Sequence, residues 1–181
     1  EMRNDKKSSA EDYVKETDKI INKIRSEYLS KRINEVVGRC LTRAQRIEYM
    51  GGSGDKIRET AEEIRWSLKF NDFSGSKKLA KKIQTLSREE YIRQMNAFVN
   101  TIKDKSNELK AEFEVDILEE LKPRIEEAKK ELKGKEIDKA FEQLRDSWEK
   151  LLSQELEAKR LRAQKRVSRM KQARRFMDAK G

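Results

Sequence analysis

The chain has 181 residues, of which 43% are charged and 35% hydrophobic, and 44 Lys and Arg against 34 Asp and Glu give a formal net charge of +10. One proline and seven glycines supply few turns, which disfavours sandwiches and barrels. Histidine, the commonest general base and metal ligand near neutral pH, is absent. We therefore expect no enzyme activity, no metal site and no cofactor.

Apolar spacing predicts a first helix over about residues 10–49, because apolar side chains recur every three or four residues. Ser8 and Glu11 have the spacing of a capping box near its start. Gly38 lies inside it, where it either weakens the helix or lets another helix approach closely. The GGSG sequence at 51–54 ends the helix, and its composition is that of an engineered flexible linker or of a natural turn. The predicted apolar stripe consists of Tyr13, Thr17, Ile20, Ile24, Tyr28, Leu29, Ile33, Val36, Cys40, Ala44 and Ile47.

Further helices are predicted after the glycines. Asp55 is expected to cap a helix with Ile57, Ala61, Ile64 and Leu68 on one face. Residues 71–76 have the character of a loop, with Ser76 starting the next helix. Ser87 and Glu90 form a second capping box, which predicts a new helix start there. The stripe of this later helix contains Tyr91, Met95, Phe98, Ile102, Leu109, Phe113, Ile117 and Leu121, with an interruption near Ser106.

The region around the only proline is predicted to contain a helical hairpin. Pro123 removes a backbone hydrogen bond, so it should kink or end its helix. Lys133-Gly134-Lys135 has the pattern of a helix end. Residues 125–132 and 137–151 could then pair, since the second segment carries a heptad spacing typical of a coiled coil or bundle face.

These patterns predict an all-α fold of long amphipathic helices in an extended bundle or in helical hairpins, with a protruding basic C-terminal helix. The expected organisation is a long helix over 1–50, a glycine-rich linker over 51–54, a bundle or hairpin region over 55–157, and an Arg/Lys-rich helix over 158–181. No apolar run approaches the roughly 18 residues that a membrane span needs. The lone Cys40 fits a reducing compartment, so we expect an intracellular protein.

Charge is concentrated at the end of the chain. Residues 108–157 carry a net charge of −6, whereas residues 158–181 carry +9. Such a segment repels itself and favours an anionic partner. Its content of arginine, which binds phosphate bidentately and stacks on bases, favours nucleic acid. A solvated tail, an anionic membrane and the acidic 108–157 region are the alternatives.

A second basic cluster follows Phe70 and Phe73. Its lysines line one side of a short helix, and neighbouring aromatic rings could stack on bases. The pattern favours the other interpretation, in which the rings are core and the lysines form a solvated face. Together the two segments give the candidate nucleic-acid-binding residues Lys159, Arg160, Arg162, Lys165, Arg166, Arg169, Lys171, Arg174, Arg175, Lys77, Lys78, Lys81 and Lys82.

The remaining polar and aromatic residues favour structural roles. Trp66 and Trp148 are expected to be core anchors, and Cys40 a buried thiol on the apolar stripe. Adjacent carboxylates on a charged helix point in different directions and stay solvated, so they do not suggest acid–base chemistry.

The leading hypothesis is a non-enzymatic, helical nucleic-acid-binding protein, for DNA or RNA, that is a structural component of a larger assembly. The alternative is a helical scaffold or coiled-coil assembly protein. In that case apolar stripes bind partner helices or a second copy, and the basic tail docks on acidic protein. We expect no membrane and no small-molecule substrate. The candidate partner-helix residues are Ile20, Ile24, Val36, Ile137, Phe141, Leu144, Trp148 and Leu151.

Overall fold

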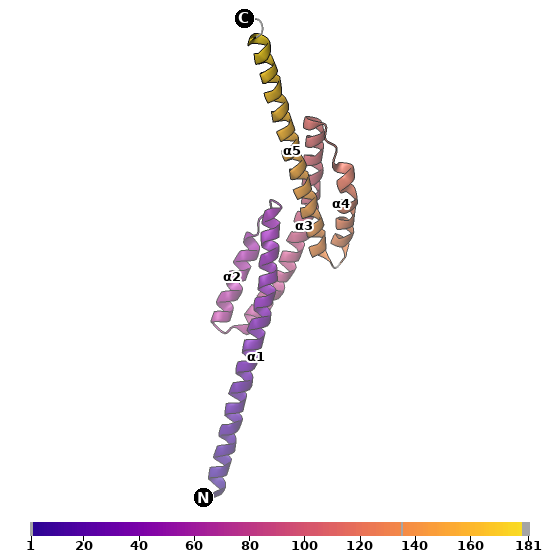
Figure 1. Cartoon of the computed structure of the whole chain (residues 1–181). Helices are drawn as coiled ribbons and strands as arrows, with labels where there is room; N and C mark the ends of the chain where they lie inside the picture. The colour runs from indigo at the N-terminus through magenta and orange to yellow at the C-terminus, as the bar shows by residue number, and fades with distance from the viewer. Residues whose placement is uncertain (1, 135, 179–181) are drawn as a thin grey trace. The chain divides into compact units, whose positions relative to one another are not determined.

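The protein is described here from a computed structural model, which covers the backbone of residues 2–134 and 136–178 and the side chains of residues 12–134 and 136–176. This part of the chain folds into five α-helices and no strand. The helices are α1 (Met2–Tyr49), α2 (Asp55–Lys69), α3 (Phe73–Phe113), α4 (Leu118–Lys133) and α5 (Ile137–Asp178) (Figure 1). The predicted all-α fold of long helices is confirmed.

The chain divides into two compact units, residues 1–91 and 92–181. The boundary lies inside α3, so the first unit contains α1, α2 and the first half of α3, and the second contains the rest. The sequence patterns predict one helical region over 55–157 and place no boundary inside it. An uninterrupted helix provides no turn residues at which a boundary could be recognised.

The core of the first unit is formed by the second half of α1, by α2 and by the first half of α3. The buried polar residue Ser87 places its hydroxyl 3.2 Å from both the Sγ of Cys40 and the carbonyl oxygen of Gln84. Ser87 therefore lies in the middle of α3, and the helix start predicted there is wrong. Cys40 is buried, as predicted. The buried apolar residues are Ile33, Val37, Cys40, Ala44, Ile47, Met50, Ile57, Ala61, Ile64, Ala80, Ile83 and Tyr91.

Glycines build the turn between α1 and α2. Gly51 has a φ of 84°, and its N–H donates to the carbonyl of Glu48 at 2.9 Å, which caps α1 with a left-handed residue. A Cβ at Gly54 would lie 2.9 Å from the Cβ of Ala44. Gly54 is also the N-cap of α2, so the prediction that Asp55 caps this helix is wrong. The GGSG sequence therefore has the conformation of a turn between packed helices, which favours that alternative over a flexible linker.

The loop before α3 is shorter than predicted. Helix α3 begins at Phe73, one turn before the expected start at Ser76. The cause is Asp72, whose Oδ1 accepts a hydrogen bond from the N–H of Gly75 at 2.9 Å and so caps the first turn.

The second unit has its own core between the second half of α3, α4 and α5. Ser106 is buried and donates to the carbonyl of Ile102 at 2.8 Å, so α3 continues through the predicted interruption. The helix ends instead at Phe113, where Glu114 adopts a φ of 60°. The buried apolar residues are Met95, Phe98, Val99, Ile102, Leu109, Ile117, Leu121, Ile125, Ala128, Leu132, Ile137, Ala140, Phe141, Leu144, Leu151 and Ala158.

Helices α4 and α5 pack against each other and confirm the predicted hairpin. Pro123 lies in the second turn of α4, and the helix continues to Lys133, so the helix does not end at the proline. Its missing N–H leaves the carbonyl of Glu119 without an intrahelical donor, but only one turn precedes the proline, so the loss is confined to the start of the helix. Gly134 is the C-cap of α4, as predicted, while Lys135 lies outside the described residues.

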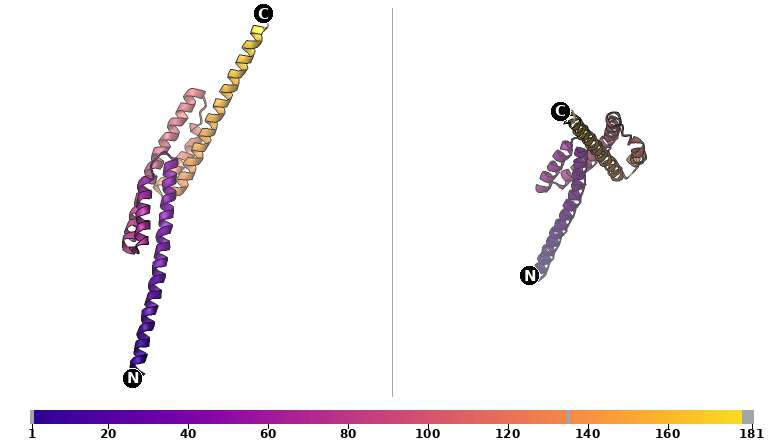
Figure 2. Two further views of the ribbon diagram at one scale, coloured as in Figure 1. Left: turned by 90° about the vertical axis from the view of Figure 1, so that its left-hand side faces the viewer. Right: turned by 45° about the horizontal axis from the view of Figure 1, so that its top comes forward.

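Two helices extend beyond the cores of their units (Figures 1 and 2). Helix α1 begins at Met2, before the predicted start near residue 10, and the side chains of Ser8 and Glu11 lie outside those described. All side chains from residue 12 to 25 are exposed. In α5, all side chains from residue 159 to 176 are exposed.

Replacing Gly38 with Ala is expected to raise the free energy of unfolding by about 0.5–1 kcal/mol. A Cβ at Gly38 would meet no atom within 4 Å, so no helix approaches closely there and Ala only gains helix propensity. Gly51→Ala is the opposite case, because its φ of 84° disfavours a side chain by about 1–2 kcal/mol. Urea unfolding followed by circular dichroism measures both. Destabilisation by Gly38→Ala would contradict the open space seen beside it.

Candidate nucleic-acid interface

The basic end of α5, which we call the basic segment (residues 158–176), is one continuous exposed helix. Ala158 is the last buried residue, and every described side chain after it is exposed. Within α5 the segment continues the same helix that forms the core of the second unit. The core of the second unit therefore fixes the direction of the helix that carries the cations, and it leaves their side chains exposed.

The first cations of the basic segment are paired with carboxylates of the second unit. Lys159 lies 2.7 Å from Glu155, and Arg160 lies 3.7 Å from Glu157. Both pairs lie within α5, at spacings of four and three residues, so they are local contacts of one helix and do not dock the tail on another part of the acidic 108–157 region. They apply to the start of the segment, where α5 still runs beside α3.

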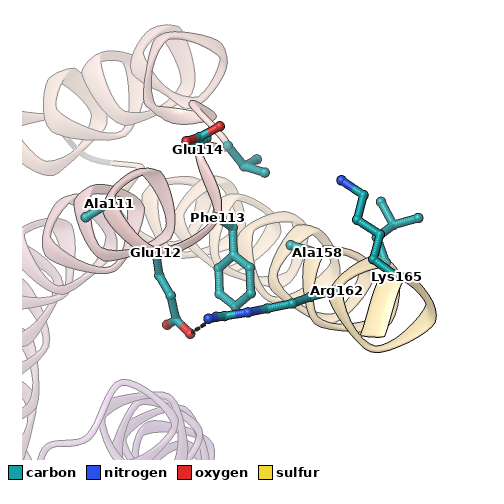
Figure 3. Close-up of a pocket in the computed structure, with 9 residues that line it drawn as sticks. Ala111, Glu112, Phe113, Glu114, Ala158, Arg162 and Lys165 are labelled. Carbon is teal, nitrogen blue, oxygen red and sulfur yellow. Dashed lines mark hydrogen bonds and ion pairs between the residues drawn. The ribbon is translucent and has the colours of Figure 1, made fainter. Parts of the chain in front are cut away.

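Arg162 completes this anchored start (Figure 3). Its guanidinium donates to Glu112 at 3.0 Å and lies 5.6 Å from the centre of the Phe113 ring, an ion pair combined with a cation–π contact. The three side chains border a pocket of about 290 Å³ that also includes Ala158 and Lys165. Arg162 therefore holds α5 to the end of α3, and part of its charge is already compensated.

The later cations have no such partners among the described side chains. Among the described residues, no ion pair reaches the following side chains: Lys165, Arg166, Arg169, Lys171, Arg174 and Arg175. At 100° per residue, Lys165, Arg166 and Arg169 lie on one side of the helix. The other three lie on roughly the opposite side. Within the described part of the basic segment, the cations without an ion-pair partner therefore all lie between residues 165 and 175, on both sides of the helix.

Glu155 links α3 to the start of the basic segment. Its carboxylate lies 3.1 Å from Lys105 of α3 and 2.7 Å from Lys159. Hydrogen bonds from Lys159 and then Lys105 lower the pKa of Glu155, and the bond to Glu155 raises the pKa of Lys105. Only 15% of the Glu155 side chain is exposed, so this bridge is screened less than the surface pairs around it.

Replacing Glu155 with Gln is expected to reduce the loss of stability in acid. Because folding lowers the pKa of Glu155, the unfolded chain binds its proton first as the pH falls. The stabilisation is complete above the ordinary pKa of Glu, about 4.3, and disappears as the pH falls through the lower pKa of the folded state. Urea unfolding between neutral pH and pH 3 or so measures the effect. Glu157→Gln is the control, with a side chain 54% exposed, and an equal effect there would contradict a special role for Glu155.

The second basic cluster is exposed on α3 and forms one wall of a groove in the first unit. The cluster consists of four exposed lysines, Lys77, Lys78, Lys81 and Lys82. Lys77 and Lys81 border a pocket of about 180 Å³ together with Arg32 and Arg39 of α1. Its floor is apolar and contains Ile33, Val36 and Ala80. These two arginines could not be assigned to the cluster from the sequence, because their spacing of seven residues gives them one face of α1 but does not show which helix packs beside it.

The aromatic residues near this cluster are not core. Phe70 is 71% exposed and Trp66 is 57% exposed, so the prediction that Trp66 anchors the core is wrong. Their rings stack at 5.9 Å, and the ammonium of Lys69 lies 5.0 Å from the centre of the Trp66 ring. Phe73 is half-buried at the start of α3. Trp148, in contrast, packs against Phe98 with ring centres 5.4 Å apart, as a core anchor should.

The predicted partner-helix residues separate into three groups by exposure. Ile137, Phe141, Leu144 and Leu151 are buried within the second unit. They already pack against the protein's own helices and are no longer open to a partner. Trp148 and Val36 are half-buried. Ile20 and Ile24 remain 54% and 60% exposed, and only these two keep the accessibility that the prediction requires.

No protein-family model, curated protein or solved structure matches the chain. Within the part that the structure describes, no helix is long and apolar enough to cross a membrane. The described side chains also contain no group of three or more Cys, Asp or Glu that could hold a metal ion.

Proposed function

We propose that this protein is a non-enzymatic, helical nucleic-acid-binding component of a larger assembly, and that residues 165–175 of α5 contact phosphates. The observation that carries this proposal is the group of six exposed cations without ion-pair partners among the described residues. Each phosphate that such a cation neutralises releases a condensed counterion, which drives binding.

The geometry of residues 165–175 fits a groove of a duplex. The segment is about 15 Å long, a length over which a duplex carries about nine phosphate charges. A major groove about 12 Å wide admits an α-helix and has phosphates along both walls. Cations on two opposite sides of α5 can therefore contact both walls. Phosphate contacts position a protein without reading bases, so we expect little sequence preference.

A salt titration with DNA, RNA and heparin tests the proposal. We expect affinity for DNA or RNA to fall steeply as salt increases, since the slope reflects the number of phosphates neutralised. A variant with all six cations replaced by Gln should lose most of this slope. Affinity that hardly changes with salt, or that survives the six replacements, would overturn the proposal. Heparin separates general polyanion binding from a preference for nucleic acid.

A further inference from the structure

A stripe of exposed apolar residues on α1 does not pack into the core of the first unit. We call it the α1 stripe, and its residues span about 22 Å of helix. Ile20 and Ile24 are 54% and 60% exposed, and Tyr28 is 65% exposed. A contiguous apolar surface of this kind marks an interaction site more often than scattered exposed residues do. The stripe consists of Tyr13, Val14, Thr17, Ile20, Ile21, Ile24 and Tyr28.

The α1 stripe lies on a different face of the helix from the core residues. At 100° per residue, its side chains fall within an arc of roughly 120°. The buried residues from Ile33 to Ile47 centre roughly 160° away from it. The α1 stripe is therefore not a continuation of the helix face that packs into the core of the first unit. An isolated helix with several β-branched residues is marginally stable in water, so a partner that covers this face would stabilise α1.

The order of residues in the α1 stripe is nearly symmetric about its midpoint. A point between Ile20 and Ile21 relates these two isoleucines to each other. The same operation relates Tyr13 to Tyr28 and Thr17 to Ile24. An antiparallel pair of α1 helices with a two-fold axis at this point would bring aromatic residues together at both ends and aliphatic residues together at the centre. Such an isologous contact closes as a dimer.

Charges along the stripe favour the same arrangement. Glu16, Lys23 and Glu27 lie on one edge of the stripe, and Asp18 and Arg25 lie on the other. In an antiparallel pair each edge faces the same edge of the second copy, so Asp18 meets Arg25, while Glu16 lies between Lys23 and Glu27 and gains no net attraction. In a parallel pair opposite edges face each other, so Asp18 meets Glu16, a pair of like sign, and loses its contact with Arg25. Complementary edge charges set the orientation of paired helices.

We propose that two copies of this chain associate through the α1 stripe, packed antiparallel about a two-fold axis between Ile20 and Ile21. This interface is separate from the basic segment of α5. It forms in the absence of nucleic acid, so its failure and a failure of nucleic-acid binding are distinguishable.

Sedimentation equilibrium over a concentration series of the full chain, without nucleic acid, tests the association. We expect a monomer–dimer equilibrium, and Ile24→Glu should weaken it at least about tenfold by placing a charge in the contact. Asn22→Glu is the matched control, because Asn22 is exposed on the face opposite the stripe and the dissociation constant should stay the same. Circular dichroism verifies that both variants keep their helices. A wild-type chain that stays monomeric throughout the series overturns the proposal.

Charge reversal and single cysteines test the orientation. Asp18→Arg and Arg25→Asp should each weaken the dimer, and the double variant should restore it, since the two charges meet only between copies. With Cys40 replaced by Ala, chains carrying Thr17→Cys and chains carrying Ile24→Cys should form disulfides when mixed and not when oxidised separately. Disulfides within the Thr17→Cys chains alone, or no rescue by the double charge reversal, would overturn the antiparallel register.

Discussion

A variant with Lys165, Arg166 and Arg169 replaced by Gln is expected to bind DNA or RNA at least about tenfold more weakly at moderate salt. Each of these side chains is exposed and can neutralise a phosphate without first breaking an ion pair in the described structure. The slope of log affinity against log salt should fall by about three, because up to three fewer phosphates are neutralised. Fluorescence anisotropy with labelled DNA and RNA over a salt series measures both quantities.

The matched control removes the same charge from the start of the basic segment. Replacing Lys159, Arg160 and Arg162 with Gln lowers the net charge equally, but these cations already contact carboxylates. We expect a smaller loss of affinity and slope. The main effect should be a modest loss of stability, since exposed ion pairs contribute about 0–1 kcal/mol each. If both triple variants weaken binding equally, affinity depends on net charge and not on whether the cations are paired with carboxylates.

Replacing Leu144 with Ala is expected to lower the free energy of unfolding by about 2–5 kcal/mol. Leu144 is fully buried, so the shorter side chain leaves a cavity in the core of the second unit. The matched control is Leu156→Ala on the same helix, because Leu156 is 71% exposed and its loss should change stability by less than about 0.5 kcal/mol. Urea unfolding followed by circular dichroism compares the two. A small effect at Leu144 would mean that this residue is not core and is open to a partner helix, as the sequence alone had suggested.

Capping patterns were the least reliable part of the sequence analysis. Ser87 and Glu90 have the spacing of a capping box, yet Ser87 is buried in the middle of α3. A serine whose hydroxyl bonds a carbonyl of its own helix is compatible with a helix interior. The Ser-x-x-Glu pattern therefore marks a helix start only where the residues before the serine are not helical. Asp72, which does cap α3, lacked a Glu or Gln three residues later and was not recognised as a cap.

The candidate interface could be located from the sequence, but the sequence does not show which of its cations are already paired with carboxylates. The charge count placed the cations at the end of the chain, because a net charge is a property of residues and not of their arrangement. Whether a given cation is compensated depends on the helix beside it. Glu112 lies fifty residues before Arg162, and only the packing of α5 against α3 brings their charged groups to 3.0 Å.

The helical character of this chain, its apolar stripes and the concentration of positive charge near its C-terminal end all follow from the amino-acid sequence. Local spacing and composition are sufficient for these properties. Which stripes are covered depends on how the helices pack. Leu144 and Ile24 have the same apolar periodicity in sequence, but one is fully buried and the other is 60% exposed. Burial depends on which helices pack against each other. A periodic pattern identifies the apolar face of a helix, but it does not identify the helix that covers this face.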